Sequence, residues 1–196
     1  MTDEGKSIKR PAGPSLKGLK FLVVEDDEHM RNLIVKVLTE IGVLGIAEAD
    51  DGSGALAVMR DFQPDIVISD WKMEPVDGIE FVRRLRAGES GINRFTAVIM
   101  LTVHTERMRI VEARDAGVNE FVAKPVSVRT LYARIRALIE EPRHFVRTDH
   151  YFGPDRRRKQ APFTGANRRL AQPWLVKVEA PGSGAPPPVM PPTPKR

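Results

Sequence analysis

An acidic cluster, an aspartate, a threonine and a lysine each follow a run of apolar residues in this sequence. In chain order they are Glu25-Asp26-Asp27, Asp70, Thr102 and Lys124. If the apolar runs are neighbouring strands of a parallel sheet, these groups gather at one edge of it. Carboxylates held that close cannot all remain charged unless a cation lies among them. Because no cysteine is present, a cation that prefers oxygen is indicated, and Mg²⁺ is the default.

A lysine and a threonine hydroxyl at the same edge could bind an anion on the other side of the metal. The metal and Lys124 would neutralise phosphoryl oxygens, and Thr102 would donate a hydrogen bond. One of the carboxylates would then act as the nucleophile. Together these residue types predict phosphoryl transfer to a carboxylate.

Each residue also has an ordinary structural explanation. Asp70 alone could be a turn residue, and the acids at 25–27 could stabilise the start of a helix through its dipole. Thr102 alone could cap a helix, and Lys124-Pro125 could be a plain connection between a strand and a helix. The joint occurrence of all four favours the functional interpretation.

The elements that must position these groups alternate between strand and helix. The hydrophobic pattern predicts strands at 19–24, 44–49, 65–69, 96–101 and 120–123, and helices at 29–41, 52–62, 78–87, 105–116 and 127–139. The central strands are continuously apolar, as expected when helices cover both faces of a parallel sheet. The sequence therefore predicts a doubly wound α/β fold with its polar groups at the carboxyl ends of the strands.

Four segments, FLVVEDDEHMR, ISDWKMEPVDG, VIMLT and FVAKP, resemble in their order and spacing the CheY-like receiver domain of two-component response regulators. The resemblance covers roughly residues 18–140. It implies a flavodoxin-like, five-stranded parallel sheet and a phosphoryl group accepted by Asp70. The donor would be a sensor histidine kinase or a histidine phosphotransfer protein. Family members of this kind are phospho-accepting switches rather than enzymes.

The resemblance also implies roles for individual residues. Mg²⁺ would be held by Glu25, Asp26, Asp70 and the backbone carbonyl of Lys72. Thr102 and Lys124 would bind the phosphoryl group, and Thr102 and Phe121 would form the conformational switch. The lifetime of the phosphoryl group would be tuned by Lys72, Val103 and His104. A haloacid-dehalogenase type of phosphatase would need a second aspartate where this chain has Lys72.

Val103 departs from the commonest pattern of the family. Val103 is branched where a smaller residue is usual, and it could crowd access to Asp70. In the family the bond between Lys124 and Pro125 is often cis, which suits a tight loop beside the site.

The composition gives expectations about the location of the protein and the distribution of its charge. No cysteine and no signal peptide are present, and the longest apolar run, 97–101, is far too short to span a bilayer. We therefore expect a soluble, cytoplasmic protein without a membrane span. Residues 1–140 contain 20 basic and 22 acidic residues, whereas residues 141–196 contain 11 and 4. The basic character belongs to the end of the chain.

Three segments are expected: a flexible arm at 1–17, a receiver domain at 18–141 and a basic, proline-rich tail at 142–196. Eleven of the 16 prolines lie from Pro142 onward, so the tail is expected to be largely disordered. The segment 174–178 could instead dock as an extra strand or bind a partner as a short motif. No motif of a conventional effector domain is found, which predicts a stand-alone receiver acting on a protein target.

The tail also carries two basic clusters among aromatic residues. They consist of Arg156, Arg157, Arg158, Lys159, Arg168 and Arg169. The plainest interpretation is a solvated, disordered segment, and the next is docking to a kinase or another acidic protein surface. The alternative function is phosphorylation-controlled nucleic-acid binding, in which the guanidinium groups meet phosphates and the rings stack on bases.

Overall fold

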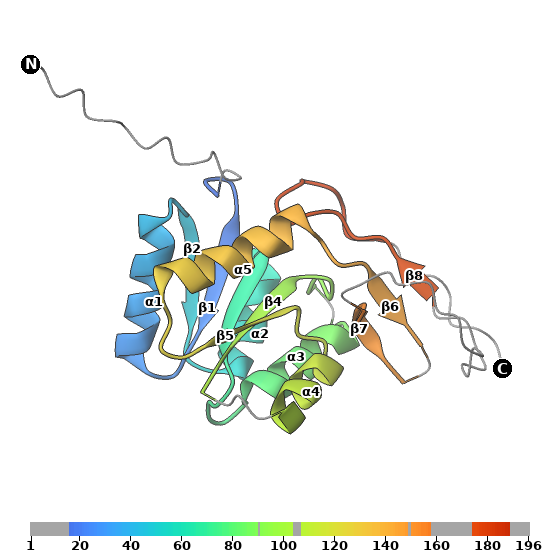
Figure 1. The fold of residues 1–196 in the computed structure, drawn as a ribbon, viewed down its shortest axis with the longest axis horizontal. Helices are drawn as coiled ribbons and strands as arrows, with labels where there is room; N and C mark the ends of the chain where they lie inside the picture. The colour runs from blue at the N-terminus through green and yellow to red at the C-terminus, as the bar shows by residue number, and fades with distance from the viewer. Residues whose placement is uncertain (1–15, 90, 104–106, 149, 158–173, 189–196) are drawn as a thin grey trace, which may run out of the picture.

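The computed structural model describes residues 16–89, 91–103, 107–148, 150–157 and 174–188. Five parallel strands form a sheet in the order β2-β1-β3-β4-β5, with helices on both sides (Figure 1). The strands are β1 (Lys20–Val24), β2 (Gly45–Ala49), β3 (Ile66–Asp70), β4 (Ala97–Thr102) and β5 (Glu120–Ala123). The helices are α1 (Glu28–Glu40), α2 (Gly52–Phe62), α3 (Gly78–Ala87), α4 (Arg107–Ala116) and α5 (Val128–Glu140). The predicted doubly wound fold is confirmed, and the element boundaries agree with the predicted ones to within two residues.

The continuous apolar character of the strands follows from burial on both faces. In β1, Phe21 and Val23 pack in the layer covered by α1 and α5. Leu22 and Val24 point the other way, into the layer beneath α2, α3 and α4. All four side chains are fully buried, because alternate residues of a strand face opposite sides of the sheet.

The strand order brings the predicted polar groups to one edge. Asp70 and Thr102 are the last residues of β3 and β4, and Glu25 and Lys124 directly follow β1 and β5. Strands β1, β3, β4 and β5 are consecutive neighbours in the sheet. The carboxyl edge of four adjacent strands therefore carries all four groups.

Asp27 belongs to this sequence cluster but has a structural role. It is the N-cap of α1, and its Oδ1 accepts a hydrogen bond from the Met30 amide at 2.8 Å. That bond lowers the pKa of Asp27. Capping satisfies one of the amides that a helix leaves unpaired at its start, so this acid fixes where α1 begins.

Beyond α5 the chain forms a second sheet, where a largely disordered tail was expected. Its antiparallel strands are β6 (Phe145–Arg147), β7 (Phe152–Pro154) and β8 (Trp174–Val176), in the order β7-β6-β8 (Figure 1). One of these strands, β8, falls in the segment 174–178 that was considered as an extra strand. Phe145 and Phe152 pack edge-on against Phe95 of the α3–β4 loop, with ring centroids 5.2 and 5.3 Å away. The segment is ordered because it shares an aromatic cluster with the receiver fold.

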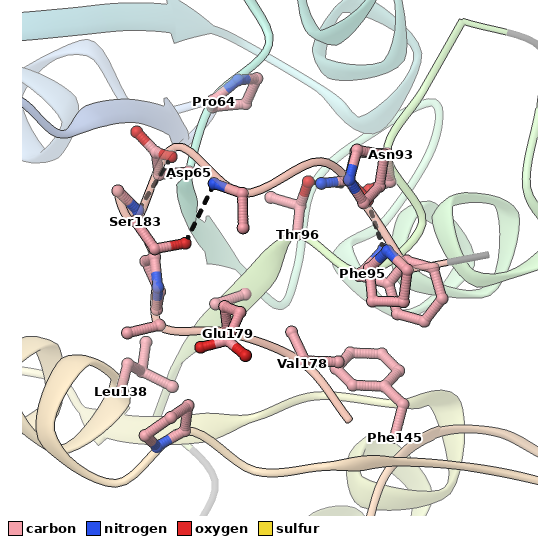
Figure 2. A pocket seen from close by; sticks show the side chains of 18 of the residues that line it. Pro64, Asp65, Asn93, Phe95, Thr96, Leu138, Phe145, Val178, Glu179 and Ser183 are labelled. Atoms are coloured by element: carbon pink, nitrogen blue, oxygen red, sulfur yellow. Dashed lines mark hydrogen bonds between the residues drawn. The ribbon is translucent and has the colours of Figure 1, made fainter. Parts of the chain in front are cut away.

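The stretch that follows β8 crosses the amino ends of β3 and β4. In Figure 2, Val178, Glu179 and Ser183 of this stretch line the same pocket as Asp65 and Thr96. The pocket has a volume of about 250 Å³. The amide of Gly182 donates to Asp65 Oδ1 at 3.2 Å, which ties this stretch to the start of β3.

The amino-terminal boundary also differs slightly from the expected one. Leu16, assigned to the flexible arm by the sequence pattern, is only 4% exposed and packs in the layer with α1 and α5. Residues 1–15 lie outside the described part of the chain. Within that part, no helix is both long and apolar enough to cross a membrane.

The aromatic cluster predicts that the second sheet stabilises the receiver. Phe145 is 1% exposed, and its ring also lies 5.0 Å from the Arg86 guanidinium carbon. Phe145→Ala should lower the free energy of unfolding by about 3–5 kcal/mol, the usual cost of deleting a buried aromatic ring. Urea unfolding of the full chain would measure it.

The matched control for that measurement is Leu175→Ala, in β8 of the same sheet. Leu175 is 60% exposed, so its removal should change stability by no more than about 0.5 kcal/mol. If Phe145→Ala costs no more than this control, the second sheet contributes nothing to the stability of the receiver.

Candidate functional site

Three carboxylates meet at the carboxyl edge of the sheet. Glu25, Asp26 and Asp70 each present an oxygen, and these three oxygens lie within 4.8 Å of one another. Glu25 is 2% exposed and Asp70 is 7% exposed, whereas Asp26 is open to solvent. The arrangement has the oxygen donors that Mg²⁺ prefers and one side open for solvent or a ligand.

Lys124 lies between two of these acids. Its Nζ is 2.9 Å from Asp70 Oδ1, and it lies 3.1 and 2.9 Å from the two oxygens of Glu25. One ammonium contacts two of the three carboxylates, so the cluster of three acids and one lysine carries a net charge of −2 when all are ionised. That balance fits a divalent cation, so the donor set and the charge both suit Mg²⁺.

Burial and pairing set the protonation of this cluster. Burial raises the pKa of Glu25, with repulsion from Asp70 in the same direction, and the hydrogen bond from Lys124 opposes it. Burial also lowers the pKa of Lys124, but the hydrogen bonds and charges of Glu25 and Asp70 outweigh it and raise that pKa overall. Lys124 therefore stays charged at neutral pH and can serve as a fixed cation.

Two hydrogen bonds fix the main chain at Asp70 and Trp71, where β3 ends. Ser69 Oγ donates to the Asp70 carbonyl at 2.8 Å, and the Gly78 amide donates to the Trp71 carbonyl at 2.9 Å. A Cβ atom at Gly78 would lie 2.1 Å from the Asp70 carbonyl oxygen, so only glycine fits there. The intervening loop, which contains a cis Glu74–Pro75 bond, folds back so that α3 starts against the strand end.

Arg31 stabilises the main chain of Glu25, a role that the sequence did not indicate. Its Nη1 donates to the Glu25 carbonyl at 2.7 Å, while its Nε pairs with Glu48 at 3.2 Å. The Glu25 amide in turn donates to the carbonyl of Ala49. Because Arg31 acts through a backbone oxygen, no side-chain pattern in the sequence marks it.

Thr102 and Lys124, the two residues predicted to bind a phosphoryl group, lie next to one another. Thr102 is 3% exposed, and its carbonyl accepts a hydrogen bond from the Lys124 amide at 2.9 Å. The Lys124–Pro125 bond is cis. Phe121 is half-buried and packs in the layer beneath α2, α3 and α4. Val103 is 68% exposed, directly beyond Thr102.

The remaining candidate residues are only partly within the described chain. Lys72, which is exposed, follows Trp71 in the loop after β3. His104, Arg158, Lys159, Arg168 and Arg169 lie outside the described residues. Arg156 pairs with Asp115 at 3.3 Å and Arg157 with Asp155 at 3.0 Å. Asp115 is next to the last residue of α4. This end of the helix lies at the amino ends of the strands, and the acidic cluster lies at their carboxyl ends.

Comparisons with known proteins agree with this geometry. A family model described as the response regulator receiver domain matches residues 21–136. The chain is 36% identical over 122 residues to the chemotaxis protein CheY of Pseudomonas aeruginosa, which covers 62% of this chain and 97% of that protein. It is 34% identical over 124 residues to the chemotaxis protein CheY-3 of Vibrio cholerae, with coverages of 63% and 94%.

Solved structures give the same picture. The chemotaxis protein CheY4 of Vibrio cholerae matches with a TM-score of 0.54 and 31% identity, over 59% of this chain and 93% of that one. The receiver domain of a sensor histidine kinase from Pseudomonas aeruginosa, solved with a magnesium ion coordinated in its active-site cleft, matches with a TM-score of 0.53 and 27% identity. That match covers 59% of this chain and 93% of the other.

The close approach at Gly78 gives a test of how the site is held. Gly78→Ala should force the loop after β3 to shift, and it should lower the free energy of unfolding by about 1–3 kcal/mol through overpacking. Gly18→Ala is the control, because a Cβ atom at Gly18 meets nothing within 4 Å. Equal stability of the two variants in urea unfolding would contradict the constraint.

Proposed function

The chain belongs to the response regulator receiver domain family, and we propose that it switches a partner-binding face when Asp70 accepts a phosphoryl group. Receiver domains are phospho-accepting switches, and histidine kinases phosphorylate them. The immediate donor here would be a sensor histidine kinase or a histidine phosphotransfer protein. The observation that carries the proposal is the contact of Lys124 with both Glu25 and Asp70 at the open edge of the sheet.

The acidic cluster would hold Mg²⁺ through Glu25, Asp26, Asp70 and the backbone carbonyl of Lys72. Bound Mg²⁺ would supply positive charge to the oxygens of the incoming phosphoryl group. The spacing and the burial of the three carboxylates support this assignment. The related receiver domain with magnesium in its cleft supports it independently.

In the transfer itself, a carboxylate oxygen of Asp70 forms a bond to phosphorus while the phosphorus–nitrogen bond of a phosphohistidine breaks. Lys124 already contacts the Asp70 carboxylate, so its ammonium is placed to neutralise the negative charge of the transferred group. Thr102, at the end of the adjacent strand, would donate its hydroxyl to a phosphoryl oxygen. Burial of Asp70 keeps this carboxylate in one position for attack.

The output would be a change in the face formed by α4, β5 and α5. Thr102 would move toward the phosphoryl group, and Phe121 would turn inward behind it. Two apolar side chains of this region are exposed: Val103, which directly follows Thr102, is 68% exposed, and Met108 of α4 is 84% exposed. Such side chains suit a protein partner.

The nucleic-acid alternative gains no support. Of the six basic residues on which it rested, Arg156 and Arg157 lie in the described part of the chain, and both pair with aspartates. Guanidinium groups already paired with carboxylates are poorly placed to neutralise a phosphate backbone.

Phosphorylation is tested most directly at Asp70. With acetyl phosphate and Mg²⁺, the full chain should gain the mass of one phosphoryl group, and Asp70→Asn should gain none. Asp61→Asn, which changes an exposed acid on α2, should behave as the unmodified chain does. Phosphorylation that persists in Asp70→Asn or in the presence of EDTA would overturn the proposal.

Lys72 should tune the lifetime of the phosphoryl group. Its exposed ammonium follows Asp70 by two residues and would attract phosphoryl oxygens and hinder water. Lys72→Ala should speed loss of phosphate by about two- to tenfold, the range of one polar contact. Lys36→Ala, at an exposed lysine of α1, is the control, and equal decay rates for the two variants would exclude this role.

A further inference from the structure

Helix α4 buries little of its own surface. Of its described side chains, at 108–116, only those of Ala113 and Ala116 are buried, and both are small. The larger apolar side chains of Met108 and Val111 are 84% and 37% exposed. A helix that buries so little apolar surface can change its position at low cost, so contacts with neighbouring segments have a large influence on where it lies.

Arg86 of α3 makes one such contact, at the turn that follows α4. Arg86 is 3% exposed, and its Nε and Nη2 donate to the Gly117 carbonyl at 3.1 and 3.0 Å. Nη2 also donates to Asn119 Oδ1 at 3.0 Å. These bonds attach the turn to another helix of the receiver itself.

The chain beyond α5 makes a second contact with the same end of α4. It does so through residues 151–156, which contain β7 and which we call the clamp segment (Figure 1). Arg156 Nη1 lies 3.3 Å from Asp115 Oδ1 of α4, and the Arg156 guanidinium carbon lies 3.9 Å from the centre of the Tyr151 ring. The backbones also approach closely, because a Cβ atom on Gly153 would lie 3.1 Å from the Cα atom of Gly117.

The clamp segment has a defined structure of its own. The Tyr151 hydroxyl donates to the Pro154 carbonyl at 2.8 Å, and the Asp155 amide donates to the His144 carbonyl at 2.7 Å. The Phe152 ring lies 5.3 Å from the Phe95 ring of the α3–β4 loop. The end of α4 therefore contacts an ordered segment that is itself packed on the receiver.

We propose that the clamp segment holds α4 in the arrangement that precedes phosphorylation and thereby opposes the switch. This inference rests on the proposed function, in which α4 changes position when Asp70 accepts a phosphoryl group. The contacts of the clamp segment occur together with direct pairing of Lys124 and the Asp70 carboxylate, at 2.9 Å. They therefore stabilise the arrangement in which Asp70 is unmodified.

The coupling acts in both directions. A contact that favours one of two states lowers the affinity for every ligand of the other state, and the ligand weakens the contact by the same factor. The Arg156 and Asp115 side chains are 38% and 43% exposed, and Asp115 also pairs with Arg114 at 3.1 Å. A pair as exposed as this one shifts an equilibrium by about two- to fivefold.

The test is the apparent dissociation constant of beryllofluoride, an analogue of the phosphoryl group, titrated calorimetrically into the full chain with Mg²⁺ in excess. Arg156→Ala should lower this constant about two- to fivefold, because a contact that opposes the switch is lost. Gly153→Ala should also lower it, because its Cβ atom would press on Gly117. Arg157→Ala is the matched control and should leave it unchanged, since Arg157 is 61% exposed and pairs with Asp155 of its own segment.

Hydrogen exchange of the amides at 151–157 measures the reverse effect. Beryllofluoride should speed their exchange in the full chain, and it should have no such effect in Asp70→Asn. The inference is overturned, with the proposed function left intact, if either clamp variant binds beryllofluoride no more tightly than the full chain, or if Arg157→Ala tightens binding as much as Arg156→Ala. Unchanged exchange at 151–157 would also overturn it. A full chain that binds no beryllofluoride would overturn both the inference and the proposed function.

Discussion

The structure depends on how charge is buried at the carboxyl edge of the sheet. Two nearly inaccessible carboxylates would be costly to ionise there, and the ammonium of Lys124 offsets that cost by contacting both. The three side chains come from the ends of β1, β3 and β5, so the register of the parallel sheet fixes their distances. Asp26, open to solvent, supplies the excess negative charge that makes the edge attractive to a divalent cation.

Much of this arrangement could be predicted from the sequence, because it rests on periodicity and on strand ends. Apolar runs that end in Glu25, Asp70, Thr102 and Lys124 define both the sheet and its polar edge. The contacts that hold these residues in position could not be predicted. Arg31 acts on a main-chain oxygen, and the need for glycine at position 78 arises from a loop that folds back on the Asp70 carbonyl. Neither relation leaves a pattern in a single sequence.

Most of the second sheet was missed for a different reason: a strand within 174–178 was considered and β8 lies there, but β6 and β7 were not predicted. Its strands are three residues long, so they show no alternation, and proline and glycine occur within β7 itself. Their order comes from contacts with Phe95, a residue that the sequence places in a loop far from them. The segment is indeed rich in proline and basic residues. Its composition could not reveal that Phe95 and the buried Arg86 of the receiver would contact its aromatic rings.

The cluster of Phe95, Phe145 and Phe152 also has a consequence for folding during synthesis. The receiver fold, through α5, leaves the ribosome before Phe145 and Phe152 do. During that interval Phe95 lacks its two aromatic neighbours, and Arg86 lacks the ring that lies against it. A newly made receiver therefore exposes the ring of Phe95 beside the Arg86 guanidinium until residues 145–152 emerge, and such exposed apolar surface favours aggregation or chaperone contact.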